Sequence, residues 1–336
     1  MKPLLEVSNL KVRFVTEGGI ARAVDGVDFS VDAGKTLGVV GESGCGKSVT
    51  SRAIMGLVEM PGWIESGQIQ FQSKDGLVDL AALPPRGQRM RGIRGREIAM
   101  IFQEPMTALN PVLTIGDQII EAMQVHETID RRAARERAIA GLAAVRMPLP
   151  HMRADEYPHQ LSGGMRQRAM IAMALVNAPS LLIADEPTTA LDVTIQAQVL
   201  DLMNDLRREF SGAIMFITHD LGVIAAMADH VAVMYRGRVV ECAPVRSIFK
   251  NPLHPYTQGL LRSVPSLTAR RGARLQTIEG SVPRATYRER GCSFATRCSQ
   301  VMPMCKEAVP ASIAVASGHT AACFLHHSSV AVVSDA

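Results

Sequence analysis

The sequence lacks any hydrophobic run long enough to cross a membrane as a helix, for which about 18 or more consecutive apolar residues are needed. Its most apolar stretch, residues 213–234, is interrupted by four ionisable side chains: His219, Asp220, Asp229 and His230. The N-terminal residues Met1–Glu6 also lack the long apolar segment of a secretory signal. We therefore expect neither a membrane-spanning nor a secreted protein, but one that stays in the cytoplasm.

The chain also has little excess charge. It carries 36 Lys and Arg against 32 Asp and Glu, a formal net charge of +4. This excess is too small to predict nucleic-acid binding, and basic clusters at residues 86–96 and 131–137 are typical of solvated loop and helix faces. With 47% hydrophobic residues among 336, the chain can form one large domain with an extension, or two domains.

Alternating apolar residues in the N-terminal part predict antiparallel strands at Leu4–Phe14, Val24–Val31 and Gly67–Phe71. Between them, the short apolar run Leu37–Val40 leads into a glycine-rich turn and then into the helical stretch Ser48–Leu57. A strand, a glycine loop and a helix in this order are the start of an α/β nucleotide-binding fold.

The middle of the chain changes from a purely helical pattern to alternating helices and strands. Residues 115–145 are rich in Ala, Arg, Glu and Ile and carry no strand signal. Leu181–Asp185 and Ile214–Thr218 predict buried parallel strands, which are apolar on both faces. His230–Met234 and Arg238–Cys242 predict a hairpin. After residue 250 the chain is weakly patterned and bears cysteines.

The most informative motif fits the pattern G-x-x-x-x-G-K-[ST] of a phosphate-binding loop. It comprises Gly41, Glu42, Ser43, Gly44, Cys45, Gly46, Lys47 and Ser48. Its glycines allow the backbone to direct several N–H groups toward phosphate oxygens, and the following helix adds the positive end of its dipole. We expect Lys47 to reach the β- and γ-phosphates of a nucleotide and the Ser48 hydroxyl to bind Mg²⁺.

Two carboxylates, Asp185 and Glu186, follow the apolar residues of the strand Leu181–Asp185. Ligands bind at the carboxyl edge of the sheet in α/β folds. We expect Asp185 to lie on the Mg²⁺ side of the site and Glu186 to orient or deprotonate the attacking water. Together with the phosphate-binding loop, this pair predicts hydrolysis of a Mg²⁺-bound nucleotide.

A third motif, Ser162-Gly163-Gly164, precedes a helical and Arg-rich segment. Polar and glycine residues at a helix start predict a second anion-binding N-terminus, far in sequence from the first. A flexible glycine linker is the alternative, although linkers seldom continue into a helix.

The three motifs together resemble the ATP-binding cassette (ABC) family over about residues 4–250. The resemblance implies a P-loop ATPase domain over residues 1–250, with an α/β core, an antiparallel β subdomain and a helical subdomain at about 104–168. Residues 251–336 would form a small irregular segment, called here the C-terminal extension. The implied ligands are ATP and Mg²⁺.

The same resemblance assigns roles to single residues. Ser162–Gly164 of one subunit would close over the ATP held by the partner's phosphate-binding loop in a head-to-tail dimer. Gln103 would sense Mg²⁺ and the attacking water, His219 would contact the γ-phosphate, and Asp192 would cross the dimer interface. Phe14 is the candidate platform for the adenine, with core packing as the alternative.

Three further segments resemble the ATPases of peptide and nickel importers: Met106–Pro111, Asn251–Thr257 and Gly291–Cys298. This resemblance covers almost the whole chain and implies uptake of peptides or a similar small solute. The implied partners are two permease subunits, a second ABC ATPase in a heterodimer or a homodimer, and an extracytoplasmic solute-binding protein. The chain would lie at the cytoplasmic face of the cell membrane as a peripheral subunit, docked through Gln103–Pro111 and Ile115–Val145.

Two other functions stay open. A soluble ABC ATPase that acts on ribosomes or DNA usually has two cassettes or a long coiled-coil insertion, and this sequence has one phosphate-binding loop and no heptad run. The ATPase of an exporter fits the core equally well but leaves the C-terminal extension unexplained. The solute is not encoded in this chain, because an ATPase subunit never touches it.

Cys45 occupies a variable position of the phosphate-binding loop, where its side chain need have no function. A helix N-terminus and the nearby Lys47 would lower the pKa of its thiol and make it reactive. Alkylation at Cys45 is therefore expected to inhibit the ATPase.

Four of the six cysteines fall in the C-terminal extension, with five, six and seventeen intervening residues: Cys292, Cys298, Cys305 and Cys323. Zinc ribbons and common ferredoxin loops use closer pairs, and a reducing cytosol argues against disulfides. Four thiols in a weakly patterned segment still suggest a shared ligand that supplies folding energy. The resemblance to the ATPases of peptide and nickel importers implies that these four cysteines bind a [4Fe–4S] cluster. The alternatives are a zinc ion, helped by His319 or His326, and free thiols.

Overall fold

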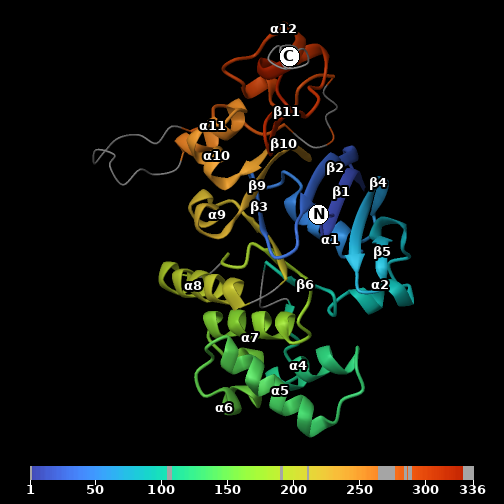
Figure 1. The fold of residues 1–336 in the computed structure, drawn as a ribbon, viewed down its shortest axis with the longest axis vertical. Coiled ribbons are helices and arrows are strands. Elements are labelled where there is room, and N and C mark those ends of the chain that lie inside the picture. The colour runs from blue at the N-terminus through green and yellow to red at the C-terminus, as the bar shows by residue number, and fades with distance from the viewer. Residues whose placement is uncertain are drawn as a thin grey trace. The chain divides into compact units, whose positions relative to one another are not determined.

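The computed structural model describes residues 2–103, 108–189, 192–209, 212–263, 277–283, 286 and 290–327. By its internal contacts the chain divides into two compact units. The first unit comprises the residues up to Leu5, Val31–Thr36 and Phe71–Ile217, and the second comprises Glu6–Ser30, Leu37–Gln70 and the chain from Thr218 onward. Figure 1 shows the elements of both, and each unit is described by itself.

The first unit contains three buried parallel strands. These are β6 (Ile98–Ile101), β7 (Leu181–Asp185) and β8 (Ala213–Thr218). Ile98 is opposite Leu181, and Leu181 is opposite Ala213, so the carboxyl ends of β6 and β7 meet at one edge. Every residue of the three strands is buried, as expected for parallel strands covered on both faces. The predictions for β7 and β8 are confirmed, whereas β6 is too short to have been recognised.

Helices make up most of the remaining first unit. They are α2 (Gln88–Ile93), α4 (Ile115–Gln124), α5 (Arg131–Ala144), α6 (Pro150–Ala154), α7 (Gly163–Leu175) and α8 (Val193–Glu209), with the short strand β5 (Gly76–Asp79). Thr114 and Asp130 cap α4 and α5 by accepting backbone N–H groups. Helices α4 to α7 pack together as the green layer of Figure 1. The helical pattern predicted for residues 115–145 is thus confirmed by α4 and α5. The bounds of the helical subdomain, about 104–168, stay a prediction, and its residues 104–107 lie outside the described residues.

The second unit begins with the strands β1 (Leu5–Thr16), β2 (Gly19–Val31) and β4 (Gly62–Ser73), in the order β2-β1-β4. Two residues connect β1 to β2, which permits only an antiparallel hairpin. The alternating apolar residues of these strands therefore form the β subdomain that the sequence predicted.

A second set of strands in this unit carries the phosphate-binding loop. Strand β3 (Thr36–Val40) pairs in parallel with β9 (His230–Tyr235), which forms the predicted hairpin with β10 (Arg238–Pro244). The described residues of this unit also form α1 (Lys47–Ile54), α9 (Leu221–Met227), α10 (Val245–Lys250), α11 (Pro255–Arg262) and α12 (Pro303–Glu307).

The C-terminal extension is more ordered than its sequence pattern predicted. Strand β12 (His319–Ala321) pairs antiparallel with β10, and β11 (Ile313–Ala316) pairs with β12. The expectation of an irregular extension is wrong for these residues, because a short strand needs little periodicity when it adds to an existing sheet edge. The boundary predicted at residue 250 stays a prediction, and β12 on β10 shows that main-chain pairing crosses it.

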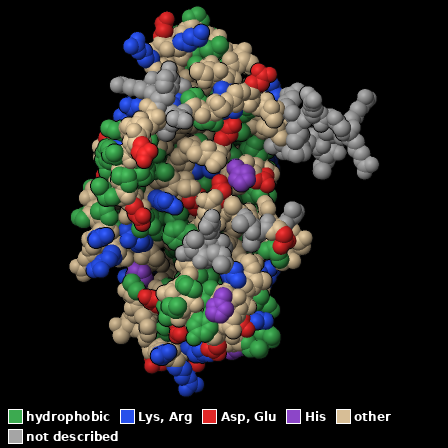
Figure 2. Space-filling view, turned by 180° about the vertical axis from the view of Figure 1, so that it is seen from behind, with side chains coloured by type: hydrophobic (Ala, Val, Ile, Leu, Met, Phe, Trp, Pro, Cys, Tyr) green, Lys and Arg blue, Asp and Glu red, His purple; other side chains and the backbone are tan. Residues whose placement is uncertain are grey.

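No helix among the described residues is long and apolar enough to span a membrane. On the face shown in Figure 2, Lys and Arg side chains are interspersed with Asp and Glu rather than gathered in one basic patch. This distribution agrees with the small net charge of +4.

Candidate functional site

The phosphate-binding loop follows β3 and ends where α1 begins at Lys47. Gly44 and Gly46 have φ angles of 76° and 102°, values that residues other than glycine rarely adopt. A Cβ on Gly46 would also collide with the carbonyl oxygen of Ala23 in β2. These constraints give the loop the strand, turn and helix arrangement that the motif predicts.

Lys47 is almost fully buried, with 5% of its surface exposed. Its Nζ donates hydrogen bonds to the carbonyl oxygens of Gly41 (2.8 Å) and Glu42 (3.2 Å). The ammonium thus lies over the loop's own backbone, where a phosphate oxygen can replace the carbonyl partners. Ser48, on the first turn of α1, is partly exposed.

Cys45 differs from the sequence expectation. Its side chain is only 2% exposed, and burial raises the pKa of its thiol even though the Lys47 ammonium acts in the opposite direction. The prediction that Cys45 has a lowered pKa and is reactive is therefore wrong, because desolvation of its thiolate outweighs the attraction of the Lys47 ammonium.

Phe14 and His219 are the other predicted site residues of the second unit. Phe14 is partly exposed, and its ring packs on the backbone of Gly62, where a Cβ would collide with it. This contact covers one face of the Phe14 ring, and the role of Phe14 as a platform for the adenine stays a prediction. His219 is exposed directly after β8, and the next residue, Asp220, caps α9.

In the first unit, Gln103 and Glu186 come together although they are distant in sequence. The Nε2 group of Gln103 donates to the Oε2 atom of Glu186 at 3.1 Å. The two residues follow β6 and β7, whose carboxyl ends meet at one edge of the sheet. No sequence pattern predicts β6, and the family resemblance implies a role for Gln103 toward Mg²⁺ and water, so its contact with Glu186 is a finding of the structure.

The two carboxylates after β7 have different environments. Asp185 is 2% exposed, whereas Glu186 is partly exposed. Glu186 has a φ angle of 46°, an uncommon value for a residue with a side chain and one that costs about 1–3 kcal/mol. Its Oε2 atom also accepts from the Thr189 hydroxyl at 3.0 Å. The surroundings thus hold the Glu186 carboxylate in a defined orientation.

Ser162 caps the N-terminus of α7, where its Oγ accepts the N–H of Met165 at 3.3 Å. Ser162 and Gly163 are exposed, and the anion-binding role of this helix start stays a prediction. Gly164 is buried, and a Cβ there would lie 2.7 Å from Cγ2 of Ile195 in α8. This second glycine therefore permits close packing of α7 on α8, a role the sequence did not reveal.

Asp192 lies just before α8 and is exposed. Its Oδ1 accepts the N–H of Ile195 at 3.0 Å, so the side chain caps the helix. A cap fixes where this aspartate lies and is compatible with the predicted position at a dimer interface. Ala190 and Leu191 of the same motif lie outside the described residues.

The four cysteines of the C-terminal extension line one small pocket: Cys292, Cys298, Cys305 and Cys323. The pocket is otherwise lined mainly by apolar side chains, including Phe294 and Leu325. All four are free thiols. Burial, reinforced by the neighbouring cysteines, raises the pKa of Cys292 to about 11. Over the part of the chain that the structure describes, no group of three or more His, Cys, Asp or Glu side chains is arranged to hold a metal ion.

The two histidines considered as zinc ligands have other partners. His319 Nε2 lies 2.8 Å from the Oε1 atom of the buried Glu241, and His326 Nε2 lies 3.0 Å from the carbonyl oxygen of Leu253. Glu241 also accepts the N–H groups of Leu253 and His254. These histidines therefore anchor the extension to the chain around residues 241–254.

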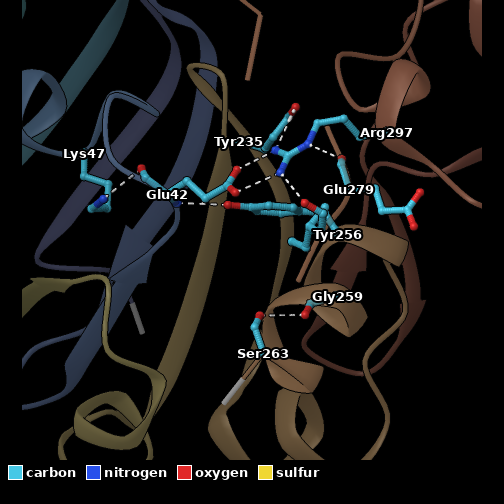
Figure 3. A network of polar contacts seen from close by, with 9 residues as sticks. Glu42, Lys47, Tyr235, Tyr256, Gly259, Ser263, Glu279 and Arg297 are labelled. Atoms are coloured by element: carbon cyan, nitrogen blue, oxygen red, sulfur yellow. Dashed lines mark hydrogen bonds and ion pairs between the residues drawn. The ribbon is translucent and has the colours of Figure 1, made fainter. Parts of the chain in front are cut away.

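Sequence reasoning missed a polar network on the phosphate-binding loop, drawn in Figure 3. Arg297 of the C-terminal extension forms an ion pair with Glu42, and the Tyr256 hydroxyl accepts the Glu42 N–H at 2.9 Å. Both partners lie in segments that had been singled out only for their resemblance to importer ATPases. No local pattern signals a contact between residues so distant in sequence.

Comparison with known proteins gives a consistent result. A family model described as ABC transporter matches residues 24–189, and one described as oligopeptide/dipeptide transporter, C-terminal region, matches residues 240–305. A putative peptide import ATP-binding protein of Brucella melitensis is 52% identical, over 96% of this chain and 97% of that protein. The oligopeptide transport ATP-binding protein of Bacillus subtilis is 50% identical, over 96% of this chain and 89% of its own length. A dimeric bacterial ABC transporter cassette of known structure covers 72% of this chain and 99% of its own, with 25% identity and a TM-score of 0.63.

Proposed function

The chain belongs to the family of ABC transporter ATPases, and from that premise we propose that it is the ATP-binding and ATP-hydrolysing subunit of an importer for peptides or a similar small solute. The observation that carries the proposal is the full-length similarity to peptide-import ATPases, C-terminal extension included. The extension argues against an exporter, because it is the part of the chain that matches oligopeptide and dipeptide transporters.

ATP and Mg²⁺ are the ligands that this family implies, and the loop residues fit them. The buried Lys47 ammonium and the backbone of Gly41–Ser48 supply the donors that phosphate oxygens require. Ser48 carries a hydroxyl oxygen, Asp185 a carboxylate oxygen and Gln103 an amide carbonyl oxygen, and oxygen ligands are those that Mg²⁺ prefers. When bound, Mg²⁺ would neutralise charge that develops on the phosphates.

Glu186 is the group proposed to orient or deprotonate the attacking water. Its carboxylate is held by Gln103 and Thr189, so one acceptor oxygen has a fixed direction before any ligand arrives. His219, exposed at the end of β8, is proposed to contact the γ-phosphate. Fixed hydrogen-bond partners of this kind lower the cost of reorganisation during reaction.

The exposed Ser162 and Gly163, with Gly164 behind them, are proposed to act on the nucleotide of a partner ATPase, and Asp192 is proposed to lie at that interface. Their exposure supports the proposal, since a surface used in trans must be accessible in the single chain. The partner would be a second ABC ATPase, in a heterodimer or a homodimer. The pair would dock on two permease subunits at the cytoplasmic face of the membrane, with an extracytoplasmic solute-binding protein delivering solute.

We further propose that the four cysteines of the extension hold a [4Fe–4S] cluster. All four line one pocket whose other walls are mainly apolar, which suits a cluster with thiolate ligands. A cluster distributes its thiolate ligands over four irons, whereas zinc draws four ligands around one ion. Anaerobic purification tests this: a brown protein absorbing near 400 nm supports the cluster, and a colourless protein with stoichiometric zinc contradicts it.

The transport function is tested with the assembled complex. The chain would be co-purified with its permeases and companion ATPase, placed in lipid vesicles, and assayed for ATP hydrolysis with and without peptide-loaded binding protein. We expect hydrolysis that rises with peptide and is lost in the Glu186→Gln variant. Hydrolysis that is independent of permeases and of every peptide would contradict an importer and favour a soluble ABC ATPase.

A further inference from the structure

The C-terminal extension contacts Glu42 of the phosphate-binding loop through Arg297 and Tyr256, and Arg297 makes the ion pair (Figure 3). Nη1 of Arg297 lies 2.7 Å from Oε2 of Glu42, and Nη2 lies 3.0 Å from Oε1. Two parallel bonds of this kind form the bidentate pair that guanidinium and carboxylate groups make best. The Arg297 side chain is 4% exposed and that of Glu42 is 29% exposed, so water screens the pair only weakly.

Arg297 is itself held in place by other groups. Its Nε donates to the carbonyl oxygen of Glu279 at 3.1 Å, and Nη2 donates to that of Ile278 at 3.3 Å. The guanidinium carbon lies 5.8 Å from the centre of the Tyr235 ring, whose hydroxyl accepts from Nη1 at 3.5 Å. The bond to Glu42 is also the main reason that the pKa of Arg297 is raised. These contacts therefore orient the guanidinium group of Arg297 independently of its bonds to Glu42.

Glu42 is restrained at three points at once. Its carboxylate meets Arg297, its N–H donates to the Tyr256 hydroxyl at 2.9 Å, and its carbonyl oxygen accepts from Lys47 at 3.2 Å. Tyr256 and Arg297 both lie beyond residue 250. The chain beyond residue 250 thus fixes the second residue of the loop, next to the ammonium that is proposed to bind phosphate.

From this geometry we propose that Arg297 is a positioning residue of the phosphate-binding loop, and that the ATP affinity of the chain depends on it. The inference rests on the proposed function. Two physical effects carry it. An ordered loop loses less conformational entropy when phosphate binds. Arg297 also neutralises a carboxylate that would otherwise repel the phosphates of the nucleotide.

The test is a double-mutant cycle on the full-length chain, read as the Kd for a fluorescent ATP analogue. Arg297→Met keeps the apolar stem but removes the fork, and Glu42→Gln keeps an acceptor but removes the charge. We expect Arg297→Met to raise Kd about tenfold, which corresponds to about 1.4 kcal/mol. The Kd of the double variant should be no higher than the higher of the two single-variant values, because both changes break the same ion pair.

Two further variants and a stability measurement complete the design. Arg297→Lys keeps the charge without the fork and should give an intermediate Kd. Arg262→Ala removes an exposed arginine of α11 and should leave Kd unchanged. The midpoint of thermal unfolding is recorded for every variant, and if Arg297→Met fails to fold, the cycle is built with Arg297→Lys.

An unchanged Kd in Arg297→Met, with or without a lower unfolding midpoint, would overturn the proposal, since Arg297 would then only stabilise the fold. The proposal would also be overturned if the increase in Kd of the double variant equalled the product of the increases in the two single variants, because the two residues would then act independently. A wild-type chain that binds ATP no better than Lys47→Ala would instead contradict the proposed function itself.

Discussion

The phosphate-binding loop and the C-terminal extension belong to the same compact unit, but local hydrogen bonds close the turns of the loop, whereas contacts distant in sequence attach the extension. In the loop, the N–H of Cys45 donates to the carbonyl oxygen of Glu42, and the N–H of Thr50 donates to that of Gly46. In the extension, His319 contacts Glu241 across 78 positions of sequence, and Arg297 contacts Glu42 across 255.

This difference separates two ways to inactivate the protein. A change in the loop removes a group that would touch the nucleotide and leaves the fold largely intact. A change in the extension removes a long-range contact, so it acts first on stability and reaches the nucleotide only through the loop. The predictions that follow test this separation, beginning with a residue outside both regions.

The largest effect is expected for Glu186→Gln, which removes the proposed catalytic carboxylate without altering either region. Hydrolysis should fall about 10²- to 10⁴-fold, the range for the loss of a general base, while ATP binding is retained. The measurement is ATPase activity of the assembled complex, together with the Kd for ATP. The side chain remains able to accept from Gln103, so the geometry is conserved.

Glu6→Gln is the matched control, since Glu6 is an exposed glutamate of β1, outside the loop, the extension and the segments expected to dock on the permeases. It should hydrolyse ATP at the wild-type rate. Near-normal turnover in Glu186→Gln would show that the water-activating group has been misassigned and that the carboxylate after β7 has only a structural role.

The next effect distinguishes the loop from the helix start at Ser162. Lys47→Ala should weaken ATP binding by the isolated chain about 100-fold, because a buried charge-assisted contact with phosphate is lost. Ser162→Arg should leave that Kd unchanged but abolish hydrolysis by the assembled transporter, since Ser162 is proposed to act on a partner's nucleotide. Titration of the monomer and assay of the complex separate the two. Equal loss of ATP binding in both variants would contradict action in trans.

The same contrast in range explains what the sequence could predict. Glycine positions and short apolar runs determine three features locally, so the sequence predicts them: the loop, the strand Leu181–Asp185 and the hairpin of His230–Met234 with Arg238–Cys242. Strand β12 and the Arg297–Glu42 pair are not predicted, because a three-residue strand and a single arginine carry no periodic signal. The pKa of Cys45 was misjudged for a related reason, since burial depends on the whole fold.

A smaller effect is expected in the extension's anchor, as a pH dependence of stability. His254 is buried, and its Nδ1 accepts the N–H of Tyr256 at 3.0 Å. Burial, with a contribution from His326, lowers its pKa from 6.5 to about 3. The unfolded chain therefore binds a proton below about pH 6.5 that the folded chain does not, and stability falls as pH decreases through this range. The loss is on the order of 1 kcal/mol for each pH unit below about 6.5.

His254→Asn tests the origin of this dependence, because an asparagine oxygen can accept the Tyr256 N–H without binding a proton. Thermal unfolding midpoints at pH 7.5 and 5.5 would be compared for both proteins. The variant should be less stable at pH 7.5 but lose less on acidification. Parallel pH profiles would mean that other groups dominate the acid sensitivity and that His254 is not the sensor.

The smallest effect sharpens the comparison between loop and extension at the level of single thiols. Burial raises the pKa of both thiols, but Cys45 is only 2% exposed whereas Cys298 in the extension is partly exposed. Because the thiolate is the reactive species and must be reached by the reagent, Cys45 should be alkylated at least about tenfold more slowly than Cys298 in the folded, metal-free chain. Mass spectrometry of peptides after timed exposure to iodoacetamide at pH 7.5 measures both rates, and urea-unfolded protein, in which the two should react alike, is the control. Saturating MgATP should slow Cys45 further without changing Cys298, since Cys45 lies within the loop that is proposed to bind phosphate. Rapid modification of Cys45 in the folded chain would show that the Lys47 cation, rather than burial, determines its reactivity.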